Sequence, residues 1–191
     1  MNLRQRAMNG VLALAVCVAW NPAVEAQSHR ETFTATAAVK TAGAAAANAP
    51  ITIVVDRKMS QKEADTLTAA FKAGGAPALR RALVGVPATG AVRLAGGASA
   101  PTRMTLERVT EKGRLLTIVT DQPIVFLGAG MPQAKSKDGY EFGIIDIEVD
   151  STGSGSGTLA PAAKVSIRQG AIVVDDYGSE VVRLIDVKKV K

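Results

Sequence analysis

The chain has 191 residues and a formal net charge of +6, with 4% aromatic residues, one cysteine and one histidine. So few aromatic side chains argue against nucleic-acid or sugar binding, which both use stacking platforms. A single histidine and a single cysteine argue against zinc sites and against Ser-His-Asp or Cys-His catalysis.

The first 26 residues have the features of a signal peptide. Arg4 and Arg6 form a positive start, an apolar core too short to span a membrane follows, and Val24-Glu25-Ala26 resembles a cleavage site. We predict cleavage before Gln27, so that residues 27–191 form one exported domain. The protein is expected to be periplasmic or secreted, without a transmembrane segment after cleavage.

Cys17 lies inside the signal segment and allows a second interpretation. Leu14-Ala15-Val16-Cys17 resembles the lipobox of bacterial lipoproteins, in which the cysteine carries the lipid. However, Val16 stands where a small residue is usual, and the apolar run continues past Cys17. We therefore interpret Cys17 as part of the signal core rather than as a lipid anchor, and the exported domain is expected to have no disulfide.

The domain is expected to begin with two strands. Apolar and polar residues alternate over 31–40, which predicts the first strand. Residues 41–49 are rich in alanine but are bracketed by glycine and proline, so we predict a connecting loop there. Residues 51–56 form a continuous apolar run, which predicts a second strand that is buried on both faces.

Two short helices are expected next, as an αα-hairpin around residues 60–85. Ser60 and Glu63 have the spacing of a capping box, in which each residue bonds to the other's backbone N–H. The pair Gly74-Gly75 ends the first helix, Pro77 begins the second, and Gly85 stops it. This insertion is predicted to cover a sheet edge or a barrel mouth, with a mobile lid or a partner-binding helix as the alternative.

Strand signals fill the middle of the chain. Val92 and Leu94 indicate a short strand, and residues 102–111 and 114–120 predict a hairpin joined at Lys112-Gly113. A further apolar run at 124–127 predicts a resumed strand.

The C-terminal stretch, residues 139–191, has the densest strand signal. Residues 144–149 alternate between apolar and acidic side chains, the period of a half-buried strand. Three more short β-branched runs follow, at 165–168, 171–175 and 181–188. This pattern predicts a β-meander, with Ser151–Gly157 as a hairpin loop.

About nine short strands and two short helices define the expected fold class. The pattern predicts a mostly-β protein with a minor α component, a single-domain antiparallel β-sandwich or β-barrel with the small αα-hairpin insertion around residues 60–85. No internal repeat is apparent.

A glycine motif at Gly128-Ala-Gly130 partly resembles a dinucleotide-binding fingerprint, with Glu148 about twenty residues further on. The pyrophosphate of such a cofactor sits on a helix N-terminus, but Pro132 follows and no apolar stripe predicts a helix. Gln133 also replaces the third glycine. We therefore predict a glycine-bearing turn here and no cofactor.

Asp146, Glu148 and Asp150 have the spacing of carboxylates at positions 1, 3 and 5 of a calcium loop. Ser151 replaces the glycine of position 6, and Gly157 replaces the bidentate glutamate of position 12. A strand would also space these carboxylates about 7 Å apart. Calcium binding is thus one hypothesis for these three residues, and a solvated strand face is the alternative.

A series of segments along the domain resembles a group of uncharacterised exported bacterial proteins. These segments are FTAT (33–36), ALRRAL (78–83), GRLLTIVTD (113–121), LGAG (127–130), LAPAAKV (159–165) and DYGSEVVRL (176–184). The resemblance covers nearly the whole domain and implies export, a single domain and bacterial origin. It implies no site residue and no activity.

The sequence leaves three classes of function open. We expect a non-enzymatic binding or interaction module of the envelope or exterior; its partner is not identified by the sequence, and the candidates are another envelope protein or a small apolar ligand. The first alternative is a lipocalin-like carrier of a small apolar ligand, which requires a closed barrel with a cavity. The second is an enzyme that uses carboxylates only, for which no catalytic pair can be named.

Overall fold

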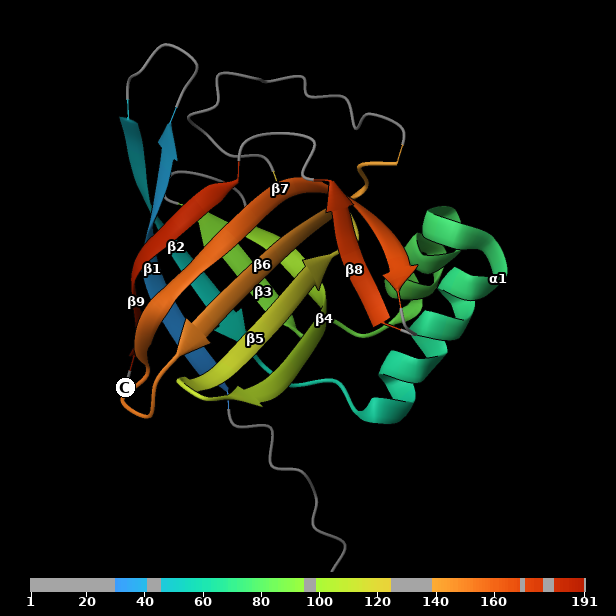
Figure 1. The fold of residues 1–191 in the computed structure, drawn as a ribbon, viewed down its shortest axis with the longest axis horizontal. Helices are drawn as coiled ribbons and strands as arrows, with labels where there is room; N and C mark the ends of the chain where they lie inside the picture. The colour runs from blue at the N-terminus through green and yellow to red at the C-terminus, as the bar shows by residue number, and fades with distance from the viewer. Residues whose placement is uncertain are drawn as a thin grey trace, which may run out of the picture.

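Eight antiparallel strands close into a barrel (Figure 1). The computed structural model describes residues 30–40, 46–94, 99–124, 139–168, 171–176 and 181–190. Their elements are β1 (Glu31–Lys40), β2 (Ala46–Val55), α1 (Gln61–Gly85), β3 (Gly90–Leu94), β4 (Ser99–Thr110), β5 (Gly113–Thr120), β6 (Phe142–Val149), β7 (Ser154–Arg168), β8 (Ala171–Asp176) and β9 (Val182–Val190).

The barrel closes because its first and last strands pair with each other. Neighbouring strands follow the order β1-β2-β3-β4-β5-β6-β7-β9, and β9 then pairs with β1. The mostly-β class with a small helical insertion is therefore confirmed, and the architecture is a barrel rather than a sandwich. Closure leaves these eight strands without the free edges that an open sheet exposes.

Alternation along the strands supplies the barrel core. In β6, Ile145 and Ile147 are fully buried, while the alternate residues Asp146 and Glu148 lie on the outer face. The same alternation corrects the prediction for residues 51–56: only one face of that strand is buried in the interior, and the residues between are half-buried on the outer wall. The prediction of burial on both faces was wrong because Val54 is apolar although it lies on the outer face.

Two predicted loops are shorter than expected because strand pairing extends into them. β2 begins at Ala46, within the predicted loop at 41–49, and Ala46 pairs with Lys40 of β1. β7 begins at Ser154, within the predicted loop Ser151–Gly157, and pairs with both β6 and β9. The small residues in both stretches suit close strand packing.

The predicted C-terminal meander is wrong in its last step, because β9 does not pair with β8. β9 pairs with the first part of β7 and with β1, whereas β8 pairs with Lys164–Arg168 at the far end of β7. Pro161 lies in an irregularity of the β6–β7 pairing, between Ala160 and Ala163. Proline lacks the N–H donor that regular pairing needs, so the strand bends there. β7 pairs with β6 once more at Ala163 and from Lys164 forms a two-stranded ribbon with β8.

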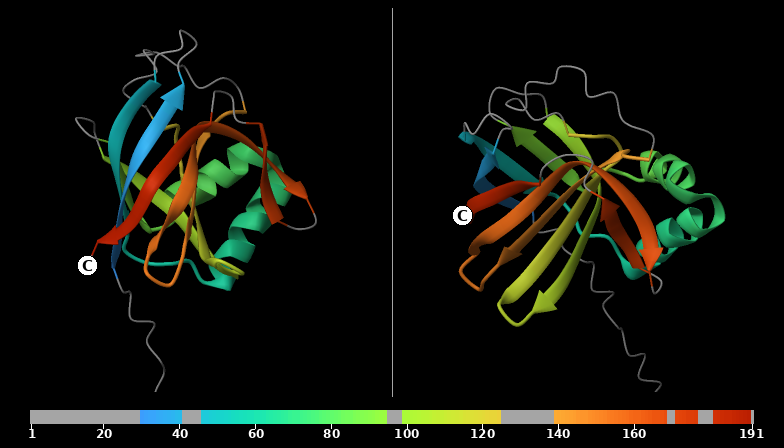
Figure 2. Two further views of the ribbon diagram at one scale, coloured as in Figure 1. Left: turned by 60° about the vertical axis from the view of Figure 1, so that its left-hand side comes forward. Right: turned by 45° about the horizontal axis from the view of Figure 1, so that its top comes forward.

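The helical insertion packs against the outside of the barrel beside this ribbon (Figure 2). The capping box of Ser60 and Glu63 is present, and the two predicted helices meet at non-helical Gly74 and Gly75, as expected. A second apolar core joins the helix, the ribbon and the outer wall. Its buried members are Leu67, Leu79, Leu83, Met104, Val119, Phe142, Ile144, Ala160, Ala163 and Val165.

The capping box gives a first prediction. Replacing Ser60 with alanine is expected to lower the free energy of unfolding by about 1 kcal/mol, because the Glu63 N–H loses its acceptor. Urea unfolding followed by circular dichroism measures this change. Ser156→Ala on the outer wall, where no hydrogen bond of the hydroxyl is found among the described residues, is the matched control. Equal stabilities of the two variants would contradict the role of the cap.

Candidate functional site

The barrel interior is packed with aliphatic side chains. A side chain that lined a ligand cavity would keep surface that water could reach. Phe33, Ile53, Leu116, Ile145 and Ile147 come from four different strands, and each is at most 1% exposed. The described interior is therefore a solid core around these side chains, as is common in barrels of eight strands.

A network of five charged residues covers one end of this core. We call Glu31, Lys58, Glu107, Arg114 and Lys189 the charge network. Arg114 donates to both carboxylate oxygens of Glu31, at 2.8 and 2.9 Å, and to Glu107 at 2.9 Å. Lys189 donates to Glu31 at 2.7 Å, and Lys58 lies 2.7 Å from Glu107. The guanidinium of Arg114 also lies 5.8 Å from the ring centre of Phe33.

Glu31 is the most deeply buried member of the charge network, with a side chain that is 8% exposed. Burial alone would raise the pKa of its carboxyl group, but the hydrogen bonds and charges of Arg114 and Lys189 outweigh burial and lower that pKa to about 2. The network therefore holds a buried carboxylate ionised. Its charges are all paired, so we assign it to closing the barrel end rather than to catalysis.

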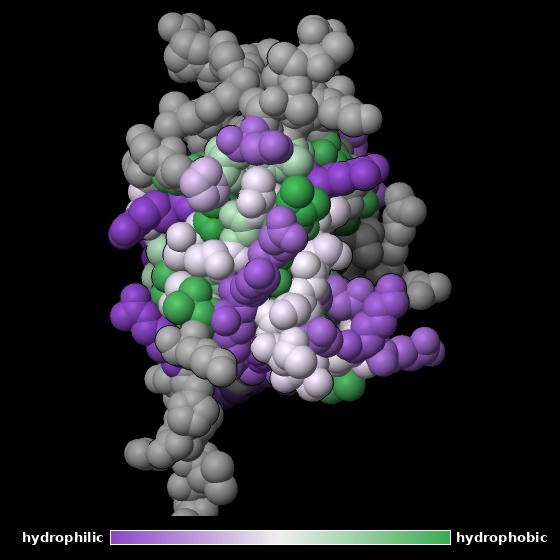
Figure 3. Space-filling view, turned by 90° about the vertical axis from the view of Figure 1, so that its left-hand side faces the viewer, coloured by the Kyte–Doolittle hydropathy of each residue, from purple (hydrophilic) through white to green (hydrophobic). Residues whose placement is uncertain are grey.

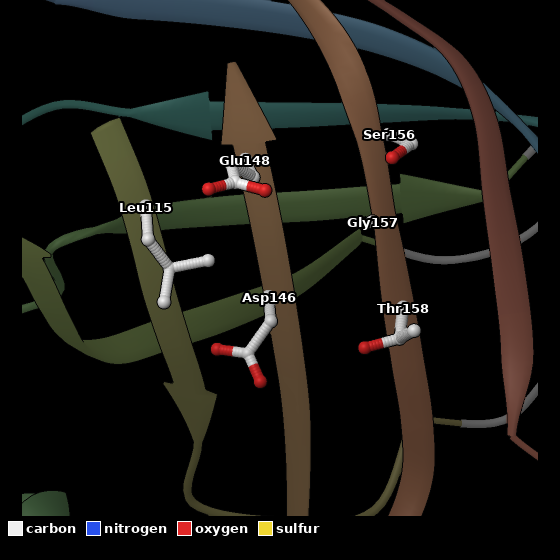
Figure 4. Close-up of a pocket in the computed structure, with 6 residues that line it drawn as sticks. All are labelled: Leu115, Asp146, Glu148, Ser156, Gly157 and Thr158. Atoms are coloured by element: carbon white, nitrogen blue, oxygen red, sulfur yellow. The ribbon is translucent and has the colours of Figure 1, made fainter. Parts of the chain in front are cut away.

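A shallow groove on the outer wall is the candidate binding site (Figure 4). It measures about 230 Å³ and runs over β5, β6 and β7. Its lining residues are Leu115, Asp146, Glu148, Ser156, Gly157 and Thr158. In Figure 4 the carboxylates of Asp146 and Glu148 project from β6 on the same side, with the hydroxyls of Ser156 and Thr158 on the neighbouring strand.

The groove contains two of the three residues of the calcium hypothesis. Asp146 accepts a hydrogen bond from the Thr117 hydroxyl at 2.6 Å. Asp150 lies apart from the groove, in the turn after β6, where one carboxylate oxygen accepts from the Thr152 hydroxyl and from two backbone N–H groups. The Thr152 hydroxyl first, and then the Ser154 N–H, lower the pKa of Asp150.

Within the described ranges, no group of three or more His, Cys, Asp or Glu side chains is arranged to hold a metal ion. Calcium binding by Asp146, Glu148 and Asp150 stays a prediction, and the positions of these three side chains give it no further support. The carboxylate of Asp150 instead shapes the turn, as an aspartate commonly does.

Several sequence predictions fall on residues outside the described ranges. These are the signal segment 1–26 with Cys17, His29, most of the strand expected at 124–127, and the glycine motif Gly128–Gly130. Ile124 itself is described: it is buried against the barrel core and donates its N–H to the Pro161 carbonyl at 2.8 Å.

The sequence did not indicate the charge network or the groove. Glu31 and Arg114 are 83 residues apart, and Glu31 and Lys189 are 158 residues apart, so no local spacing connects them. The alternation of β6 did place Asp146 and Glu148 on one face. Pairing with β7 places Thr158 opposite Asp146 and Ser156 opposite Glu148, which completes the polar lining of the groove.

Comparison with known proteins found no match: no protein-family model, no curated protein and no solved structure matches the chain. In the part of the chain that the structure describes, no helix is long and apolar enough to cross a membrane.

Proposed function

We propose that the protein is an exported, non-enzymatic interaction module of the bacterial envelope, and that it binds a basic side chain of a partner protein in the groove of β5, β6 and β7. The observation that carries this proposal is the pairing of Asp146 and Glu148 in an open hollow of about 230 Å³. Pockets for small organic ligands usually enclose about 300–1,000 Å³. One lysine or arginine side chain is a better match for this volume.

The chemistry of the lining supports the same occupant. Two carboxylates accept charge-assisted hydrogen bonds from an ammonium or guanidinium group. Leu115 offers apolar surface to the methylene stem of such a side chain, and the hydroxyls of Ser156 and Thr158 offer further acceptors. An interaction of this kind at an exposed groove favours specificity and association rate over high affinity.

The carrier alternative has the closed barrel in its favour, because barrels of eight strands can hold one small ligand. The burial of Phe33, Ile53 and Ile145 weighs against it, because these side chains meet in the interior where such a ligand would lie. We therefore place binding on the outer wall.

Site-specific photocrosslinking in cells tests the proposal. A photoreactive amino acid at Ser156, an exposed residue at the groove, is expected to give a discrete adduct with another envelope protein. The variant D146N/E148Q, with the same photoreactive residue, is expected to reduce that adduct at least about fivefold, since charge-assisted hydrogen bonds are about twice as strong as neutral ones.

Two controls separate the groove from general surface charge. The photoreactive residue at Ala69, exposed on α1, should give no such adduct, and the variant D65N/E111Q removes two negative charges elsewhere on the surface. An adduct at Ser156 that survives D146N/E148Q, or one that D65N/E111Q reduces equally, would contradict the proposal.

A further inference from the structure

A second wall of the barrel carries unpaired positive charge. It is formed by β9, β1, β2 and β3. In the closed order it begins at β9, where Arg183 pairs with Thr158 at the edge of the groove, and it turns away from the groove towards β2, which lies four strands from β6 in either direction. Arg93, Arg183 and Lys188 are exposed on this wall, and none has an ion pair among the described residues. We call these strands the basic wall.

Strand pairing fixes how these cations lie. Lys188 pairs with Thr34, Thr34 with Thr52, and Thr52 with Arg93, so the four residues form one row across the four strands. With about 4.8 Å between strands, the row is about 14 Å long. Arg183 lies further along β9, opposite Ala38.

Between the cations the basic wall is nearly free of negative charge. Figure 3 shows this side of the molecule, where hydrophilic side chains are interspersed with near-neutral ones. Asp186 is the one carboxylate at an outward position of these four strands in the described part of the chain. Just past β2, Asp56 is paired with Arg30 at 3.2 Å. The three cations therefore outnumber the unpaired carboxylates on this wall.

Apolar side chains lie on the same wall. Ile185 and Val190 are 42% and 47% exposed, and Val54 is half-buried beside Thr32. Cations that surround hydroxyl and aliphatic groups suit a surface of anionic headgroups over hydrocarbon, because the cations meet phosphates while the small side chains approach the interface.

We propose that the basic wall docks on the surface of an anionic phospholipid bilayer, with the groove facing away from the membrane. The two walls differ in charge, since Asp146 and Glu148 project from β6, which lies four strands from β2 in the closed order. An anionic surface attracts one wall and repels the other, which orients the barrel. Screening over about 10 Å at 0.1 M salt restricts the attraction to the wall in contact. The basic wall shares no residue with the groove.

Vesicle co-sedimentation tests this proposal. The purified protein is expected to bind vesicles of phosphatidylcholine with 30% phosphatidylglycerol at 0.1 M salt, and to bind pure phosphatidylcholine vesicles far more weakly. Each basic residue near an anionic surface contributes about fivefold in affinity, so the variant R93Q/R183Q/K188Q is expected to lose about 100-fold. Raising the salt to 0.5 M should release the wild-type protein.

The matched control removes three exposed cations from the helical insertion instead, as K62Q/K72Q/R80Q. It changes the net charge equally and should weaken vesicle binding by less than about threefold. Equal melting temperatures of both triple variants and the wild type confirm that all are folded. The proposal would be overturned if both triple variants lost vesicle binding equally. It would also be overturned if the wild-type protein bound vesicles with and without phosphatidylglycerol equally at 0.1 M salt.

Discussion

Replacing Arg114 with methionine is expected to lower the free energy of unfolding by about 3 kcal/mol. Methionine keeps much of the stem of the side chain but leaves the Glu31 carboxylate, 8% exposed, without its two guanidinium donors. Breaking a buried ion pair on one side usually costs about 3–5 kcal/mol, and the remaining contact with Lys189 places this case at the lower limit. Urea unfolding at neutral pH measures the difference.

The pH dependence of stability tests the reason for this loss. The pKa of Glu31 is lowered to about 2 from 4.5, so its contribution is present above about pH 5 and is lost as the pH falls towards 2. That difference in pKa corresponds to about 3 kcal/mol. The wild-type protein should therefore lose stability over this interval, whereas R114M should lose less.

Two variants complete the experiment on the charge network. Arg108→Met on the outer face of β4 removes an exposed arginine and should change stability by less than about 0.5 kcal/mol. Adding Glu31→Gln to R114M removes the buried carboxylate charge that Lys189 alone would then balance, and should restore part of the loss. If R114M is no less stable than R108M, the charge network does not stabilise the barrel end.

Local features of the sequence were enough to predict most of the elements. β1 runs over Glu31–Lys40, as its alternation predicts, and β4 and β5 meet at the predicted turn. The capping box fixes the start of α1, and the glycine pair fixes its kink. Each of these features depends on residues within a few positions of one another, and the physics of turns, caps and alternation acts over that range.

The barrel's closure could not be predicted in the same way. It depends on β1 pairing with β9 and on β6 pairing with β7, and the first of these contacts joins the two ends of the domain. An alternating strand is equally suited to a sandwich, where it would face another sheet. The alternation therefore predicts which residues are buried, such as Ile145 and Ile147, but not which strands they meet.

The two candidate surfaces, the groove and the basic wall, also differ in how much of each the local sequence predicts. Alternation placed Asp146 and Glu148 together on one face, whereas the row from Lys188 to Arg93 exists only because three successive strand pairings align their registers. A shift of one residue in any of these pairings would turn the side chains of one strand to the opposite face. The pattern of surface charge on a barrel therefore depends on the register between strands, and the sequence of a single strand does not specify that register.

Gly157 is a position where the pairing of two strands depends on the absence of a side chain. It lies in β7 between two neighbours, paired with Ile147 of β6 on one side and with Leu184 of β9 on the other. A Cβ atom at this position would lie 2.3 Å from the carbonyl oxygen of Asp146 and 2.8 Å from Cγ2 of Ile147. Neither neighbouring strand can withdraw without loss of its own pairing.

Replacing Gly157 with alanine is therefore expected to cost about 3 kcal/mol or more, the upper range for overpacking. For a domain of this size the melting temperature should fall by about 6–12 °C. Ser156→Ala, one residue away but exposed on the outer wall, should change the melting temperature by less than about 2 °C. Calorimetry on both variants makes the comparison.

The two glycines of β7 allow a further distinction. Gly155 approaches β6 even more closely, since a Cβ atom there would lie 1.9 Å from the Glu148 carbonyl oxygen, but it is exposed and adjacent to the turn. Gly155 is also paired on both sides, with Val149 of β6 and Val187 of β9, but the end of a strand beside a turn can shift more easily than its middle. Gly155→Ala should therefore cost less than Gly157→Ala despite its shorter contact. The reverse order, or a Gly157→Ala variant as stable as Ser156→Ala, would show that β7 can move within the barrel.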